Sequence, residues 1–187
     1  MAQPSVHGRF IWQELMTADT AAAGAFYSRV IGWHTEPYPG PESGYSTFSV
    51  GSARVGGLTN LAQDVREAGA RSQWLPFIGT DDVDATAAAA ERLGGKVLHS
   101  PADIENVGRY AVLADPQGAA FGAYRPQRPD ASRARREVQP GEFAWHELAT
   151  SDYEAAFDFY RELFGWEALQ RMDMGPAGTY LIFGRGG

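Results

Sequence analysis

The fold is decided by a stretch that occurs twice, as Gly8-Arg-Phe-Ile-Trp-Gln-Glu-Leu-Met-Thr17 and again as Gly141-Glu-Phe-Ala-Trp-His-Glu-Leu-Ala-Thr150. A shift of 133 residues relates the two copies, and the same shift aligns further residues of uncommon type. These pairs are Asp19 with Asp152, Phe26-Tyr27 with Phe159-Tyr160, and Gly32-Trp33 with Gly165-Trp166. Because tryptophan, glycine and aromatic positions coincide without a gap, the chain contains an internal repeat.

The two copies differ in length. Gly187 corresponds to Arg54, whereas the first copy continues for about 70 more residues before a segment rich in proline and arginine. Such a segment is typical of a solvated linker. The sequence therefore predicts a complete domain at 1–126, a linker at 127–140 and an incomplete first module of a second domain at 141–187. A full second copy would end near position 259.

The first domain has an internal order of one strand, one helix and three strands, which occurs twice in modules 9–60 and 73–125. Residues 9–16 alternate apolar and polar character, as a half-buried strand does. Polar cap residues and glycines bound the two helices. The first module predicts a strand at 9–16, a helix at 19–31 and strands at 45–50 and 53–60, so one of its three later strands is not assigned to particular residues. The second predicts a strand at 73–79, a helix at 83–93 and strands at 96–100, 109–114 and 119–124.

Composition excludes several classes of protein. The 187 residues carry a formal net charge of −7, which does not favour a broad nucleic-acid interface. Cysteine is absent, so disulfides, thiolate metal sites and cysteine nucleophiles are excluded. The first residues lack an apolar signal core, and no apolar run approaches the ~18 residues of a membrane span. We expect a cytoplasmic protein without nucleic-acid or membrane partners.

Three motifs of the second module carry a family resemblance: Asp81-Asp82-Val83-Asp84, Gly94-Gly95-Lys96-Val97 and the run from Gly108 to Gly118. Together with the repeat, they make the chain similar to the vicinal oxygen chelate superfamily of glyoxalase I, bleomycin-resistance proteins and extradiol dioxygenases. Tandem glyoxalase-like proteins resemble it most. The resemblance implies an α+β fold in which paired βαβββ modules form a curved mixed sheet around a cup, with helices on the convex side. It places ligand and metal inside the cup.

Metal enzymes of this superfamily take ligands from four strand positions, which the resemblance places at Trp12, Gly57, Leu75 and Gly122. None of these side chains offers the nitrogen or carboxylate oxygen that a metal needs. A register slip of one residue would bring in Gln13 or His146, but strand alternation would turn them to the opposite face. The spacing of the histidines does not suit a metal site either; they are His7, His34, His99 and His146. We therefore expect no metal and no cofactor.

Alternation also predicts the lining of the cup, because every second residue of a strand faces the same way. The expected ligand-binding residues are apolar or aromatic apart from one carboxylate and one hydroxyl, as in many small-molecule pockets. The glycines leave space where metal enzymes place carboxylates. The full set is Phe10, Trp12, Glu14, Gly57, Thr59, Leu75, Phe77, Gly122 and Tyr124.

Glu14 is the candidate catalytic residue. A partly desolvated carboxylate has a raised pKa, which suits acid–base work or pairing with a cationic ligand. The alternative is that Glu14 accepts hydrogen bonds from Arg109 or backbone groups and only braces the sheet. Trp12 has two similar alternatives, ligand stacking or filling the vacant metal position. Trp74, Arg109 and Tyr110 are candidate rim contacts, and the core is expected to contain Phe26, Tyr27 and Trp33.

The sequence thus favours a glyoxalase/bleomycin-resistance-like protein that binds a small apolar or aromatic molecule without a metal. The alternative is a metal-dependent lyase or dioxygenase of the same superfamily. A third interpretation is a structural role in which Trp12, Phe77 and Tyr124 fill the cup. Residues 141–187 are too few to form a stable domain alone. We expect them to dock on residues 1–126 or to form a homodimer with a second chain.

Overall fold

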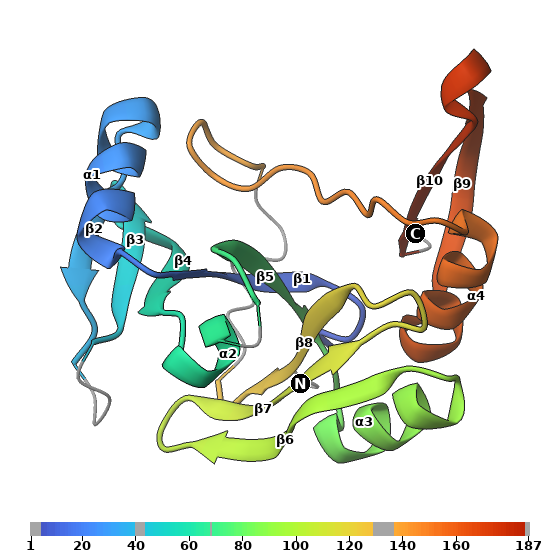
Figure 1. The fold of residues 1–187 in the computed structure, drawn as a ribbon, viewed down its shortest axis with the longest axis horizontal. Coiled ribbons are helices and arrows are strands. Elements are labelled where there is room, and N and C mark those ends of the chain that lie inside the picture. The colour runs from blue at the N-terminus through green and yellow to red at the C-terminus, as the bar shows by residue number, and fades with distance from the viewer. Residues whose placement is uncertain (1–4, 40–43, 68, 129–136, 186–187) are drawn as a thin grey trace. The chain divides into compact units, whose positions relative to one another are not determined.

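A computed structural model describes residues 5–39, 44–67, 69–128 and 137–185; residues 129–136 of the expected linker lie outside the described part. The fold is α+β, as expected. An eight-stranded mixed sheet has the order β2-β3-β4-β1-β5-β8-β7-β6, and β9 and β10 form a separate two-stranded sheet (Figure 1). The elements along the chain are β1 Phe10–Thr17, α1 Thr20–Ile31, β2 His34–Pro37, β3 Ser46–Val50, β4 Ala53–Asn60, α2 Gln63–Glu67, β5 Gln73–Gly79, α3 Val83–Arg92, β6 Lys96–Ile104, β7 Gly108–Ala114, β8 Ala120–Pro126, α4 Tyr153–Phe164, β9 Trp166–Asp173, a short 3-10 turn at Gly175–Ala177, and β10 Thr179–Arg185.

The same cap begins each of the three long helices. The carboxylates of Asp19, Asp82 and Asp152 accept a hydrogen bond from a backbone N–H three residues later, at 2.9–3.0 Å. This bond satisfies one of the free N–H groups at a helix start, which is why aspartate favours this position. Gly32 and Gly165 end α1 and α4 in the left-handed conformation, with φ of 84° and 66°. None of the described helices is long and apolar enough to cross a membrane.

The second copy of the repeat, which begins at Gly141, departs from the expected order at its first strand. Residues 144–150 form no strand, although their counterparts belong to β1. In the first copy, β1 pairs in parallel with β4, with Glu14 opposite Gly57 and Leu15 opposite Leu58. The helix α4 forms, with its apolar face packed against α3 and β8, and β9 and β10 form an antiparallel pair.

Contacts divide the chain into two compact units that do not follow the order of the sequence. Unit 1 contains residues 1–11, 78–131 and 147–187, and unit 2 contains residues 12–77 and 132–146. Unit 1 therefore contains the residues that begin the first copy, up to Ile11, and unit 2 contains the residues that begin the second copy, up to His146.

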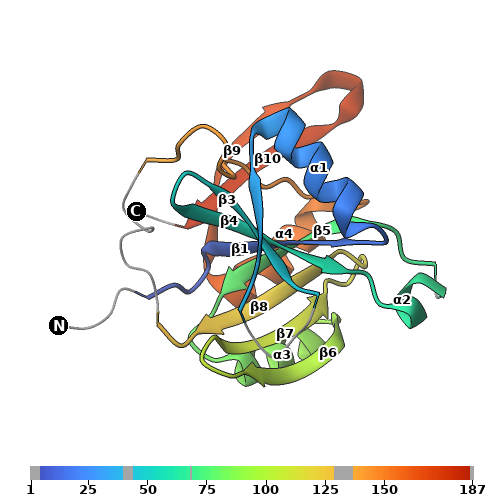
Figure 2. The same ribbon diagram turned by 90° about the vertical axis from the view of Figure 1, so that its left-hand side faces the viewer.

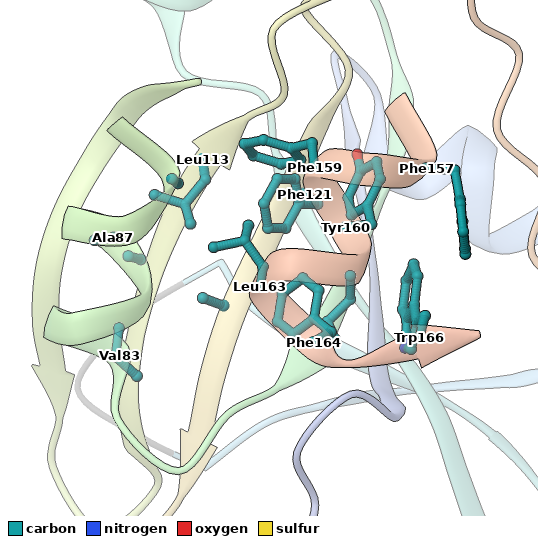
Figure 3. Close-up of a cluster of buried hydrophobic side chains, with 14 residues drawn as sticks. Val83, Ala87, Leu113, Phe121, Phe157, Phe159, Tyr160, Leu163, Phe164 and Trp166 are labelled. Carbon is teal, nitrogen blue, oxygen red and sulfur yellow. The ribbon is translucent and has the colours of Figure 1, made fainter. Parts of the chain in front are cut away.

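Unit 1 has a core between α3, α4 and the strands β7 and β8 (Figures 2 and 3). Figure 2 shows β6, β7 and β8 side by side with α3 on one face. Figure 3 shows the aromatic face of α4 directed toward Phe121 and α3.

The Tyr160 hydroxyl of α4 donates to the buried Asp115 carboxylate at 3.1 Å, and the other oxygen of Asp115 accepts from two amides of the β7–β8 turn. Burial raises the pKa of Tyr160 well above its usual range, and the Asp115 charge adds to this effect. Asp115 thus ties the turn to α4.

Unit 2 has its own aromatic core. Trp33 packs among Phe48, Leu15 and Leu58, and its ring stacks on Tyr27 with a centroid distance of 5.3 Å. Fully buried Phe48 contributes apolar area of the kind that dominates core energetics.

Two tryptophans make reciprocal contacts across the repeat. The Trp33 indole N–H donates to the Gly141 carbonyl at 2.6 Å, and the Trp166 indole N–H donates to the Gly8 carbonyl at 2.8 Å. Trp33 is the counterpart of Trp166, and Gly8 is the counterpart of Gly141. The aromatic residues two positions after each glycine repeat the exchange, since Phe143–Trp33 and Phe10–Trp166 both have centroid distances of 5.5 Å. The residues that begin each copy therefore pack against the tryptophan that follows the helix of the other copy. This reciprocal exchange resembles the contacts of a symmetric pair.

Candidate functional site

The two faces of the sheet in unit 1 carry different residues. Ala111 and Leu113 of β7, with Phe121 and Ala123 of β8, belong to the helix-covered core. Because successive side chains of a strand alternate, Tyr110, Val112, Gly122 and Tyr124 lie on the opposite, helix-free face. Gly122 and Tyr124 therefore lie on the face that the sequence predicts for ligand.

On this helix-free face of unit 1, two residues make packing contacts. Tyr110 stacks on His99 of β6 with a centroid distance of 5.1 Å and an interplanar angle of 17°. The Tyr124 hydroxyl donates to the Val107 carbonyl at 3.1 Å. The ring of Tyr124 remains half-buried, so this bond fixes its position while leaving part of the ring accessible.

The helix-free face of unit 2 is built around a tryptophan and a tyrosine. Leu15 and Leu58 pack in the core of this unit, which places Trp12, Glu14 and Thr59 on the other face by alternation. The Trp12 indole N–H donates to the Tyr45 hydroxyl at 3.0 Å.

Tyr45 also closes the space expected at Gly57. A Cβ atom at Gly57 would collide with the Tyr45 hydroxyl and come within 3.2 Å of the Trp12 indole nitrogen. The glycine therefore admits the tyrosine and does not leave an empty place for a ligand. Sequence reasoning did not find Tyr45. Its signal is weak, because only the register that sets Thr47 opposite Gly57 brings Tyr45 diagonally across to this face.

Glu14, the candidate catalytic residue, is half-buried on the same face as Trp12. Arg109, one of its expected bracing partners, is engaged elsewhere. The guanidinium group binds the Asp84 carboxylate with two hydrogen bonds of 2.7 and 2.8 Å and lies 3.0 Å from Asp103. The Arg109 hydrogen bond lowers the pKa of Asp84. This clamp joins the start of α3 to the β6–β7 hairpin and gives Arg109 a structural role; its expected rim contact stays a prediction.

Three further expectations need correction. Trp74 does not line a rim, because its indole N–H donates to the Tyr27 hydroxyl at 2.9 Å and its ring packs against Phe143 in the unit 2 core. Trp74 alternates with Leu75, which puts the tryptophan on the core face. Phe26, expected in the core with Tyr27 and Trp33, is exposed. Phe10, expected to face the ligand, packs against Trp166 beside the core of unit 1.

Gln13 and His146 occupy equal positions of the repeat and contact each other. The distance between Gln13 Nε2 and His146 Nε2 is 2.6 Å, and the imidazole stacks on Phe143. Burial lowers the pKa of His146, which favours the neutral ring that can accept a bond from the amide. Gln13 is buried on the side of Leu15, so the pair holds residues 141–146 in unit 2 and does not belong to the helix-free face.

The residues at the four positions expected for a metal do not fit one. Trp12 and Leu75 offer no ligand atom, and Gly57 and Gly122 offer no side chain. Within the described residues, no group of three or more histidine, aspartate or glutamate side chains is arranged to hold a metal ion.

The predicted ligand residues are divided between the units. Unit 2 contains Trp12, Glu14, Gly57, Thr59, Leu75 and Phe77, and unit 1 contains Phe10, Gly122 and Tyr124. Leu75 and Phe77 are buried, whereas Trp12, Glu14 and Thr59 keep accessible surface. Taken by itself, the face of unit 2 offers two aromatic rings, a hydroxyl and a carboxylate, which suit stacking on a flat ligand and one polar contact.

Comparison with known proteins agrees with this architecture. Residues 13–123 match the family described as glyoxalase-like domain, and residues 142–187 match the glyoxalase/bleomycin resistance protein/dioxygenase superfamily. The chain belongs to the glyoxalase-like family. The two matched segments lie on either side of the expected linker.

Two groups of curated relatives are similar to this glyoxalase-like protein. It is 41% identical to the putative glyoxylase CFP32 of Mycobacterium tuberculosis over 120 residues, which cover 64% of this chain and 44% of the relative. It is 33% identical to the anthracycline biosynthesis protein DnrV of Streptomyces peucetius, covering 82% and 59% of the two chains. It is 32% identical to the anthracycline biosynthesis protein DauV of Streptomyces sp., covering 90% and 63%. The chain therefore spans less than two thirds of the length of these relatives.

Solved structures share the fold at low sequence identity. The Mn(II)-bound glyoxalase of Novosphingobium aromaticivorans has a TM-score of 0.57 and 20% identity, with coverage of 88% of this chain and 54% of the other. A mutant of 4-hydroxymandelate synthase from Streptomyces coelicolor has a TM-score of 0.59 and 16% identity, with coverage of 89% and 55%. These likenesses concern the fold alone.

Proposed function

We propose that the protein binds a flat aromatic small molecule on the helix-free face of its sheet, without a metal ion. The observation that carries the proposal is the set of residues at the four expected metal positions, Trp12, Gly57, Leu75 and Gly122. These residues replace ligand atoms by an indole ring, an aliphatic side chain and bare backbone. At one of them, Tyr45 lies where a Cβ atom would be.

The class of ligand follows from the partly exposed side chains of this face. Trp12 and Tyr45 present aromatic surface, and their mutual hydrogen bond fixes both rings in place. Rings held in this way lose little freedom when another ring stacks on them. Two relatives are named for anthracycline biosynthesis, and an anthracycline has a fused aromatic ring system of the required shape. We therefore take an anthracycline as the first ligand to test.

Glu14 supplies the polar contact in this proposal. The carboxylate is half-buried beside Trp12 on β1, where partial loss of solvent strengthens its interaction with a cation or with a proton of the ligand. A ligand carrying an acidic C–H or O–H group would make Glu14 a general base; a ligand carrying a cationic group would make it a counter-ion. Glu14→Gln keeps the shape and removes both roles.

The test is a calorimetric titration of the purified chain with an anthracycline. We expect saturable binding in the micromolar range. Trp12→Leu should weaken binding by roughly three- to tenfold, the amount expected for an aromatic pair. Trp145→Leu is the matched control, because Trp145 holds the equal position of the repeat and is exposed. Equal loss in both variants, or no saturable binding of the parent chain, would reject the proposed site.

A further inference from the structure

The Tyr45 hydroxyl group is held at one point of the helix-free face of unit 2. The indole N–H of Trp12 donates to it at 3.0 Å, and it lies where a Cβ atom of Gly57 would be. The Tyr45 ring also meets the ring of Tyr38 edge-on, with a centroid distance of 6.0 Å. On the backbone, the Tyr38 N–H donates to the Tyr45 carbonyl at 3.1 Å. These contacts fix the hydroxyl group above Gly57.

The hydrogen bond between Trp12 and Tyr45 has a fixed direction. An indole nitrogen is a donor only, so the Tyr45 oxygen is the acceptor. The proton of the phenol is therefore not used in this bond and is directed to a different acceptor. A hydroxyl group that accepts one hydrogen bond becomes a stronger donor in the next, because neighbouring hydrogen bonds polarise each other. Trp12 thus prepares Tyr45 as a donor.

Glu14 places an acceptor beside this donor. Strand β1 pairs in parallel with β4, and Glu14 is the Cα partner of Gly57 in that pairing. Neighbouring strands lie about 4.8 Å apart, so the Glu14 side chain starts next to the residue that Tyr45 covers. Both side chains belong to the helix-free face, and a carboxylate accepts hydrogen bonds without donating them. One point of this face therefore combines a directed donor with an acceptor.

The second module does not carry this combination, although it has a tyrosine at the equal position. Tyr110 precedes the strand partner of Gly122 by two residues, as the tyrosine of the first module precedes the partner of its glycine. In place of the tryptophan and the carboxylate, β5 carries Leu75 and Phe77. Neither of these side chains donates or accepts a hydrogen bond, and Tyr110 stacks on His99. The donor–acceptor pair is thus a specific feature of the first module.

We propose that Tyr45 and Glu14 together bind one phenolic hydroxyl group of the ligand, so that the site selects phenols among flat aromatic molecules. A phenolic oxygen accepts the proton of Tyr45, and its own O–H donates to the Glu14 carboxylate. One hydroxyl group satisfies both protein groups, whereas an ether or ketone oxygen satisfies Tyr45 alone. This inference rests on the proposed function, because the ligand ring stacks on the same face.

Three ligands with the same ring system separate the two hydrogen bonds: 2-naphthol, its methyl ether and naphthalene. The naphthol offers a donor and an acceptor, the ether offers an acceptor alone, and naphthalene offers neither. Equilibrium dialysis against the purified chain measures the three affinities. We expect the ether to bind about three- to tenfold more tightly than naphthalene. The naphthol should bind about tenfold more tightly than the ether, since a hydrogen bond to a charged group is the stronger one.

Two variants assign the two bonds to their residues. Tyr45→Phe removes the donor and should make the ether bind like naphthalene. Glu14→Gln removes the charge and should reduce the preference for naphthol over the ether to about threefold or less. Tyr153→Phe is the control, because it removes the hydroxyl group of a tyrosine on α4 that donates to Glu154, and it should keep the parent ratios. A general loss of folded protein lowers all three affinities alike and leaves these ratios unchanged.

The outcomes distinguish this inference from the proposed function. If none of the three ligands binds, the proposed function fails and the phenol site fails with it. If all three bind equally and Trp12→Leu weakens each of them, the aromatic site stands and the selectivity for phenols is wrong. A preference for naphthol that survives both Tyr45→Phe and Glu14→Gln would also overturn the inference.

Discussion

Substitution of two residues at equal positions of the repeat tests whether their burial differs in solution as it does in the structure. Leu163 on α4 lies in the core of unit 1 and is 6% exposed, whereas Val30 on α1 is 63% exposed. Removal of a buried leucine side chain to alanine costs about 2–5 kcal/mol, because transfer energy is lost and a cavity remains. The same truncation at an exposed position changes stability by about 0.5 kcal/mol or less. Alanine favours helix more than valine, so Val30→Ala is expected to be neutral or slightly stabilising.

Urea unfolding and thermal melting measure this difference. For a chain of this size, 3 kcal/mol corresponds to a decrease in Tm of about 6–12 °C. We expect Leu163→Ala to show this decrease without a large change in the m-value, while Val30→Ala melts with the parent chain. If the two units melt separately, the loss should affect the transition of unit 1. A cost below about 1 kcal/mol for Leu163→Ala, or a comparable cost for Val30→Ala, would refute the assigned burial.

Three further predictions concern buried contacts. Tyr160→Phe removes the hydroxyl donor to Asp115 and should cost about 1–3 kcal/mol in urea unfolding, because one buried carboxylate oxygen loses its bond; a cost near zero would contradict the role of this bond. The pKa of His146 is lowered by burial, so the unfolded chain takes up a proton first as the pH falls below about 6.5. Stability should therefore decrease from pH 7.5 to 5.5, and His146→Gln should reduce that decrease in melting experiments; an identical pH profile for the variant would exclude this cause. Gly57→Ala should lower Tm because its Cβ meets Tyr45, and the loss should be smaller in a Tyr45→Ala background; equal losses in both backgrounds would show that Tyr45 is not the obstacle.

Local signals in the sequence predicted most elements of this fold. Asp19 and Asp82 mark helix starts because a carboxylate cap acts within three residues. Gly32 marks a helix end for an equally local reason, its left-handed conformation. Residues 115–118, which the sequence analysis leaves between the strands at 109–114 and 119–124, form a turn in which the Gly118 N–H donates to the Asp115 carbonyl at 3.0 Å.

The differences arise where a residue depends on distant parts of the chain. Tyr45 reaches Gly57 only through the pairing of β3 with β4, which the sequence does not specify at single-residue accuracy. The position of Trp74 at the start of its strand predicts a rim contact, whereas its burial depends on the hydrogen bond to Tyr27, 47 residues away. The helical spacing of Phe26 predicts a core position, but the described residues do not cover its face of α1.

The candidate site was predictable in part. Alternation placed Gly122 and Tyr124 on the helix-free face and Leu15 on the core face, as the core clusters require. Alternation does not predict that Phe10 packs on Trp166. That contact joins the start of the first copy to the tryptophan after the helix of the second copy. The roles of Trp12 and Glu14 stay predictions, since they depend on a ligand.

The central claim is that binding on the helix-free face needs no metal, and titration of a chelator-treated chain tests it most directly. The purified protein is divided, one half is treated with a chelator, and both halves are titrated calorimetrically with an anthracycline while their metal content is measured. We predict the same saturable binding in both halves and no stoichiometric divalent ion in either. Binding that is lost with the chelator and restored by one divalent ion per chain would contradict the claim and support a metal-dependent lyase or dioxygenase.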